Sequence, residues 1–138
     1  MLEKEIAILK AINLLKKCES VELASINEDG YPRICEMERM LSDGIERIYF
    51  TTKITSNKVR HFYENKKAGV GYCIDDNCVS LTGDIDIITD IFEKKRLWNR
   101  ERTKHLLDDE KGSQYCILCF KATKATIFID GLYFETQL

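Results

Sequence analysis

The sequence has 138 residues, of which 44% are hydrophobic and 32% charged, with a formal net charge of −2. This length suits one domain with a sizeable core, and this composition excludes a disordered chain. Charges of both signs are interspersed and no apolar run could span a bilayer, so we expect neither nucleic-acid binding nor membrane insertion. The N-terminal residues lack a signal-peptide pattern, which predicts a cytoplasmic location.

The first part of the chain predicts one helix followed by short strands. The expected elements are a helix over 2–17 and strands over 21–27, 31–40 and 45–51. The helix is predicted because apolar residues recur at helical spacing. Turn signals, Asn27-Glu28-Asp29-Gly30 and Ser42-Asp43-Gly44, separate the strands and predict antiparallel hairpins.

The stretch from Tyr49 to Phe62 begins as a strand and ends as a helix. Between them lie four hydroxyl groups and two lysines: Thr51, Thr52, Lys53, Thr55, Ser56 and Lys58. Ser56 is placed to cap the helix, and free N–H groups at a helix start beside a lysine suit a phosphate. Spacing alone favours a simpler interpretation, a capped helix whose lysines face water.

The remaining chain predicts more strands and one further helix. The expected elements are strands over 68–74 and 79–87, a helix after Asp90, a helix end and loop over 104–112, and two strands, 114–121 and 125–130, joined by a polar turn. Gly83 marks a bend in its strand, and Asp90 with Glu93 resembles a capping box. Consecutive short antiparallel strands most economically form a small barrel with peripheral helices.

Six cysteines without an export signal are expected to be mostly reduced. Cys116 and Cys119 form a CxxC pair, but in a strand they point to opposite faces, which argues against a zinc site or a redox dithiol. Cys73 and Cys78 flank a turn and could face each other across a hairpin. We favour two half-buried thiols there over a redox pair. The sequence shows no metal-ligand cluster, and no nucleophile stands beside either histidine.

The order of several short motifs resembles one known family. The motifs are Gly30-x-Pro32-Arg33, Phe50-x-Thr52-x-x-x-Ser56-x-Lys58, Val79-x-Leu81-x-Gly83 and Leu97-Trp98. They resemble the pyridoxamine 5′-phosphate oxidase-like FMN-binding split barrels, especially the general stress protein and nitroimidazole-reductase-like group. The resemblance covers about Glu5 to Gly131, so residues 1–138 are expected to form a single domain. It implies a mainly β, α+β fold, an antiparallel split β-barrel, assembled as a homodimer with FMN at the subunit interface.

The resemblance also implies cofactor-binding positions. These are Arg33, Cys35, Glu36, Met37, Thr51, Thr52, Ser56, Asn57, Lys58 and Ser80. The two threonines match contacts to the ribityl chain and phosphate, and residues 56–58 match the phosphate-binding helix start. Residues 33–37 match a strand that passes the flavin ring, and Ser80 matches a position that faces the partner's flavin. With this resemblance, a phosphate site becomes the favoured interpretation of the helix start.

Several positions depart from the family pattern. Cys35 stands where many relatives have a phosphate-binding arginine; its thiol either leaves a positive charge missing or packs as a small apolar residue. Asn57 replaces another arginine of the true oxidases, and Trp98 is expected to be a core or dimer-contact residue. The oxidases' C-terminal Trp and Arg have no counterpart near 126–138, so oxidation of pyridoxamine phosphate is not expected.

The sequence therefore predicts an FMN-binding flavoprotein, an NAD(P)H-dependent oxidoreductase that reduces an unknown small-molecule acceptor. An alternative is a flavin-binding stress-response protein without turnover, a sensor or store. A third possibility, a small barrel that binds nucleic acid or acts as a scaffold, is disfavoured by the net charge. No residue is a convincing general acid or base, so the catalytic residues stay unassigned.

Overall fold

The computed structural model describes residues 2–101 and 112–138, which form three helices and eight strands. The helices are α1 (Leu2–Lys16), α2 (Asn57–Glu64) and α3 (Ile91–Glu101). The strands are β1 (Ser20–Ile26), β2 (Pro32–Glu38), β3 (Leu41–Asp43), β4 (Arg47–Lys53), β5 (Lys67–Ile74), β6 (Asn77–Ile88), β7 (Tyr115–Ile129) and β8 (Leu132–Gln137).

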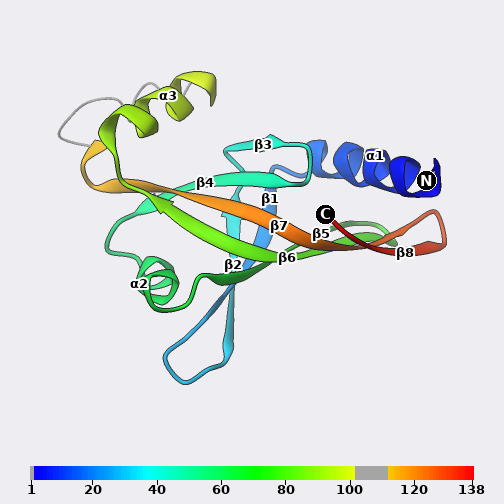
Figure 1. The fold of residues 1–138 in the computed structure, drawn as a ribbon, viewed down its shortest axis with the longest axis horizontal. Coiled ribbons are helices and arrows are strands. Elements are labelled where there is room, and N and C mark those ends of the chain that lie inside the picture. Colours follow the sequence, from blue (N-terminus) through cyan, green and yellow to red (C-terminus); the bar gives the residue numbers. More distant parts are fainter. Residues whose placement is uncertain (1, 102–111) are drawn as a thin grey trace.

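All eight strands belong to one antiparallel sheet. Their order is β2-β1-β5-β6-β7-β4-β3, and β8 pairs with β7 beside this path. The sheet curls into a half-barrel, with α1 and α3 near opposite ends of the long strands and the β1–β2 hairpin projecting from the body (Figure 1). The expected split-barrel fold with peripheral helices is confirmed.

The two faces of β4 and β7 build two separate apolar clusters. Phe50 and Leu118 belong to the main core inside the curled sheet, whereas Tyr49 and Ile117, their immediate neighbours, pack under α3. This division follows from the alternation of side chains along a strand. Trp98 is fully buried in the α3 cluster, which confirms its expected core role.

Helix α1 covers the main core and is fixed to the sheet by a buried hydrogen bond. Its apolar stripe packs against β5, β7 and β8. The Tyr72 hydroxyl of β5 donates to the carbonyl oxygen of Ala11 at 2.8 Å. Burial raises the pKa of Tyr72 well above its ordinary value, so the phenol remains a neutral donor.

The largest difference from the sequence prediction is β7, which is one strand of 15 residues rather than two strands around a turn. The residues that were predicted to form a turn, 122–124, occupy exposed or half-exposed positions of this strand. Thr123 donates to the carbonyl oxygen of Thr82 at 3.2 Å, and Lys121 pairs with Asp86 at 2.7 Å. Thr82 pairs with Lys124 and Gly83 with Ala122, so Thr123 is an extra, bulged residue of β7, opposite the position in β6 where a bend was expected.

Two short strands were also missed. The expected strand 31–40 ends at Glu38, and Leu41–Asp43 pairs separately with β4 as β3. Strand β8 follows a two-residue turn at Asp130 and Gly131, whose φ angles of 56° and 76° are typical of a type I′ hairpin.

The helix starts agree with the predictions in part. The backbone N–H of Glu93 donates to Asp90 Oδ2 at 3.0 Å, which confirms the cap of α3. The Glu93 carboxylate pairs with Arg96 instead of returning to Asp90. The expected loop 104–112 lies, except for Gly112, outside the described residues. None of the described helices is both long enough and apolar enough to cross a bilayer.

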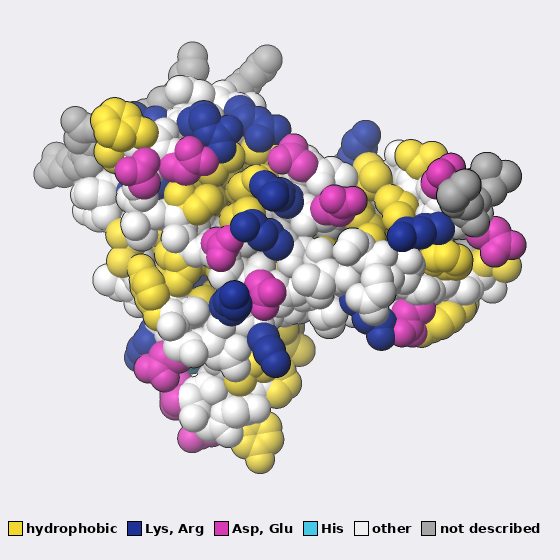
Figure 2. Space-filling model, viewed as in Figure 1, with side chains coloured by type: hydrophobic (Ala, Val, Ile, Leu, Met, Phe, Trp, Pro, Cys, Tyr) yellow, Lys and Arg dark blue, Asp and Glu magenta, His cyan; other side chains and the backbone are white. Residues whose placement is uncertain are grey.

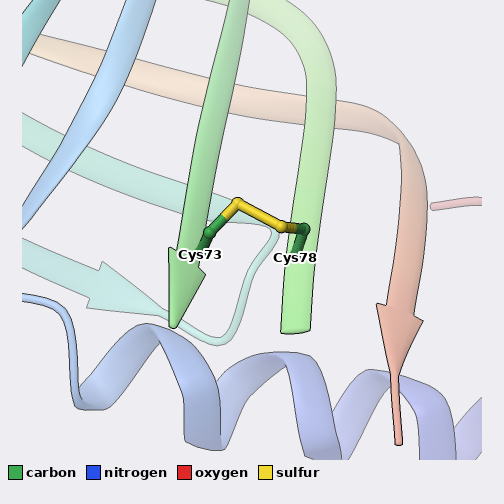
Figure 3. Close-up of a disulfide and its surroundings, with 2 residues drawn as sticks. All are labelled: Cys73 and Cys78. Atoms are coloured by element: carbon green, nitrogen blue, oxygen red, sulfur yellow. A yellow bond between two sulfur atoms is a disulfide. The ribbon is translucent and has the colours of Figure 1, made fainter. Parts of the chain in front are cut away.

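The prediction of two reduced thiols at Cys73 and Cys78 is wrong, because the two residues form a disulfide (Figure 3). They do lie opposite each other in the β5–β6 hairpin, as expected, with Cα atoms 4.2 Å apart. Ile74 and Asn77 close this hairpin, so the cysteines occupy the next pair, where facing side chains approach most closely.

The CxxC prediction is confirmed. Cys116 lies in the main core and Cys119 in the α3 cluster, on opposite faces of β7. Burial raises the pKa of Cys116 to about 11 and also raises that of Cys119, so both groups remain protonated thiols.

Candidate functional site

Three polar side chains converge where β4 passes into α2. Thr52 is buried at the end of β4, and its hydroxyl donates to the Ser56 hydroxyl at 3.4 Å. The Lys58 ammonium, on the first turn of α2, donates to Thr52 Oγ1 at 3.5 Å. In the sequence motif, Ser56 and Lys58 follow Thr52 by four and six residues. The structure brings their two hydroxyls and the ammonium together.

The backbone turns sharply at this junction, and the N–H groups at the start of α2 have no acceptors within the helix. The N–H of Ser56 donates to the Lys53 carbonyl oxygen at 3.1 Å, and the N–H of Ile54 donates to that of Gln114 at 2.9 Å. Ser56 occupies the predicted N-cap position, yet its hydroxyl makes no capping hydrogen bond. The first N–H groups of a helix lack intrahelical acceptors, so this helix start can receive an anionic oxygen.

Helix α2 is held firmly behind this junction. Val59 and Phe62 are buried in the main core. On the same helix, His61 is buried with its Nδ1 3.1 Å from Ser25 Oγ of β1, and its Nε2 lies 3.3 Å from a Glu28 carboxylate oxygen. The sequence gave no sign of this contact, because Ser25 and His61 are far apart along the chain.

Thr51 does not join Thr52, because neighbouring residues of a strand face opposite sides. Its hydroxyl accepts a hydrogen bond from Trp98 Nε1 at 3.0 Å and lies 2.8 Å from the sulfur of Met40. The side chain is therefore directed toward α3 and away from the Thr52 hydroxyl.

The four predicted residues of β2 divide between its two faces. Cys35 and Met37 are half-buried against the main core, and Arg33 is exposed on the same face, paired across from Ser25 of β1. The Cys35 thiol lies 3.7 Å from the carbonyl oxygen of Leu23, in hydrogen-bond geometry. This placement supports the interpretation of Cys35 as a packing residue.

Glu36 points to the other face, into a surface cavity of about 610 Å³ that Ser80 also lines. Ser20 Oγ donates to the Glu36 carboxylate at 2.7 Å. Ser80 pairs with Thr126 near one end of β7, whereas Thr52 pairs with Cys116 near the other end. One chain therefore holds two separate groups of predicted site residues. We call the first, Thr52, Ser56, Asn57 and Lys58, the α2 junction. The second, Glu36 and Ser80, lines the surface cavity described above, which we call the β5–β6 cavity.

The charges near these groups are modest. Lysine and arginine side chains alternate with aspartate and glutamate over the face drawn in Figure 2, without a large field of one sign. Within the described parts of the chain, no cluster of three or more His, Cys, Asp or Glu side chains could hold a metal ion. The positive charge of Lys58 at the α2 junction is therefore local and suits one small anionic group.

A family model described as pyridoxamine 5′-phosphate oxidase matches residues 9–127, and the chain belongs to this family. A search of curated proteins finds no match. Similar folds are nevertheless found among solved structures. A protein from Clostridium acetobutylicum, related to general stress protein 26 of Bacillus subtilis, is 24% identical with a TM-score of 0.81, over 97% of this chain and 96% of that one.

Two further solved structures show the range of the fold. A putative 5-nitroimidazole antibiotic resistance protein from Bacteroides thetaiotaomicron is 10% identical with a TM-score of 0.71, over 84% of this chain and 80% of that one. A heme binding protein from Mycobacterium smegmatis is 13% identical with a TM-score of 0.75, over 95% of this chain but 57% of that one. At these identities the likeness concerns the fold alone.

Proposed function

We propose that this protein is a cytoplasmic, FMN-binding oxidoreductase that transfers electrons from NAD(P)H to a small-molecule acceptor. The observation that carries the proposal is the α2 junction, where a lysine, two hydroxyls and the free end of a helix converge in a chain of this family. A phosphate monoester matches this donor set, because its oxygens accept several hydrogen bonds and its charge is offset by Lys58.

Each group at the junction has a distinct part in this proposal. The Lys58 ammonium binds a phosphate oxygen, the hydroxyls of Thr52 and Ser56 donate to others, and the backbone N–H of Asn57 faces the same anion. FMN, when bound, supplies the chemistry by accepting a hydride and releasing electrons to the acceptor. The chain itself binds the cofactor, orients it and shields it from water.

The separation of the two groups of site residues supports a homodimeric site. The α2 junction can hold a phosphate, and the β5–β6 cavity, of about 610 Å³, can receive the flavin ring. Because they lie toward opposite ends of β7, one chain does not enclose both parts of FMN. In the proposed dimer, the junction of one protomer meets the cavity of its partner across a two-fold axis.

The visible absorption spectrum tests the proposal directly. The purified protein, loaded with FMN and freed of excess cofactor, should show the two visible bands of a bound flavin. Anaerobic NADH or NADPH should bleach them, and oxidised acceptor should restore them. Retained flavin without bleaching would favour the alternative, a flavin-binding stress-response protein without turnover. A protein that retains no flavin would contradict both.

Subunit mixing tests the shared site. Lys58→Ala disables the junction, and Ser80→Trp fills the cavity, so neither homodimer should bind FMN tightly. Unfolding and refolding an equal mixture should restore binding at about one quarter of the sites, because half of the dimers are mixed and each has one intact site. Binding that fails to return, while light scattering still shows dimers, would place both residues in a site within one chain.

A further inference from the structure

The Cys73–Cys78 disulfide stands at the wall of the β5–β6 cavity, which both cysteines line together with Glu22, Glu36 and Ser80. We propose that it is an exchange site for small neutral or cationic thiols, which reduce the pair while the protein remains folded. The proposal needs no flavin and concerns the protein without FMN, because the function proposed above places the flavin ring and the partner subunit at this same cavity.

Exposure distinguishes this pair from the other sulfur groups. Cys73 is exposed and Cys78 half-buried, and the cavity gives a small molecule access to both. Cys18, Cys116 and Cys119 are buried, and Cys35 is half-buried on the core side of β2. An attacking thiolate must reach a sulfur atom, so the pair is the most accessible target among the described cysteines.

The fold does not depend on this bond. It closes a loop of sequence separation 5, which restricts the unfolded chain less than a longer loop would. The backbone pairing of β5 with β6 continues through Ile74 and Asn77, beyond the cysteines. Asn77 Oδ1 also accepts a hydrogen bond from the Asp130 N–H at 3.0 Å, which anchors the hairpin to the end of β7. The hairpin is therefore held in place when the sulfur atoms separate.

The exchange proceeds in two balanced steps. The thiolate of a first small thiol attacks Cys73 Sγ; the bond between the two cysteines breaks, and Cys78 leaves as a thiolate that takes up a proton. A second thiolate attacks the outer sulfur of the mixed disulfide and releases Cys73 as a thiolate, which is also protonated. Two thiols are oxidised to one disulfide, and the protein pair gains two electrons and two protons.

The charges at the cavity select the thiol. Its charged lining residues are Glu22 and Glu36, and the adjacent turn adds Asp75 and Asp76. Lys10, at the same end of the sheet, is bound to Asp130 at 2.9 Å. Carboxylates repel an anionic thiol and attract a cationic one, an effect that salt weakens.

Trapping under native conditions tests the exchange. The protein is incubated with cysteamine, quenched with acid, alkylated with iodoacetamide and mapped by mass spectrometry. We expect Cys73 and Cys78 to be alkylated together, Cys116 and Cys119 to remain unmodified, and the circular dichroism spectrum to be unchanged. A pair that opens only in denaturant, or that never closes in oxidised dithiothreitol, would overturn the proposal.

Two comparisons test the chemistry further. When each rate is divided by the rate of the same thiolate with a small neutral disulfide, which removes the difference in nucleophilicity, cysteamine should react at least about threefold faster than 3-mercaptopropionate, and Glu22→Gln/Glu36→Gln should reduce the difference. Equal normalised rates would reject the selection by charge. With cystamine, Cys78→Ser should form a mixed disulfide at Cys73 faster than Cys73→Ser does at Cys78. The reverse order would refute attack at Cys73.

Discussion

Replacing Lys58 by alanine is expected to weaken FMN binding by roughly tenfold to a hundredfold. Lys58 is the cation of the α2 junction, where its ammonium donates to Thr52 Oγ1. A charge-assisted contact to phosphate contributes about 1.5–3 kcal/mol, which corresponds to that loss of affinity. Titration of the unloaded variant with FMN, followed by flavin fluorescence, measures the change.

Two controls separate a phosphate contact from a general disturbance. Lys53→Ala removes an exposed lysine of the same connection and should leave FMN affinity within about twofold. Riboflavin lacks the phosphate, so it should bind the wild type and Lys58→Ala equally. An unchanged FMN affinity in Lys58→Ala, or an equal loss for riboflavin, would refute the assignment of Lys58 to the phosphate.

Gly83→Ala is expected to lower the free energy of unfolding by roughly 3 kcal/mol. Gly83 of β6 lies opposite the bulge of β7, and an added Cβ would overlap the carbonyl oxygen of Lys121 and lie 2.8 Å from the Cα of Ala122. Both are backbone atoms of β7, so relief requires the two central strands to separate. Urea denaturation, followed by circular dichroism, gives the free energy.

Gly69→Ala is the matched control, since it makes the same substitution in the neighbouring strand β5. There an added Cβ would lie 3.6 Å from the carbonyl oxygen of Leu81 and 3.8 Å from the Cβ of Ala24, which are ordinary contacts. The free energy of unfolding should change by less than about 1 kcal/mol. Equal stability of the two variants would show that β6 and β7 adapt to the extra atom.

Local patterns in the sequence were sufficient for most of the fold. The apolar stripe of α1, the turn at Gly30, the bend at Gly83 and the cap at Asp90 each depend on residues close in the chain, and each was predicted correctly. The α2 junction belongs to the same class, because Thr52, Ser56 and Lys58 lie within one strand–turn–helix unit. Their convergence follows from local geometry, and the family resemblance suggested a phosphate as the ligand.

Features that depend on distant partners were missed. Residues 122–124 were predicted to form a turn, but Ala122 and Lys124 pair with β6, and Lys124 also pairs with β8, so the chain stays extended there. The contact of Ser25 with His61 joins two elements that approach only when the sheet curls. For Cys73 and Cys78, the pairing was foreseen but the bond was not, because spacing alone does not give the oxidation state of two facing thiols.

The continuous strand β7 has a consequence for how the protein folds during synthesis. It pairs with β4, β6 and β8, and it lies between β6 and β4 in the sheet. Until β7 leaves the ribosome, β6 and β4 each expose an unpaired edge, and β4 has no pairing strand except the short β3. The main core therefore closes late, through contacts of long sequence separation, which slow folding and favour aggregation of the incomplete chain.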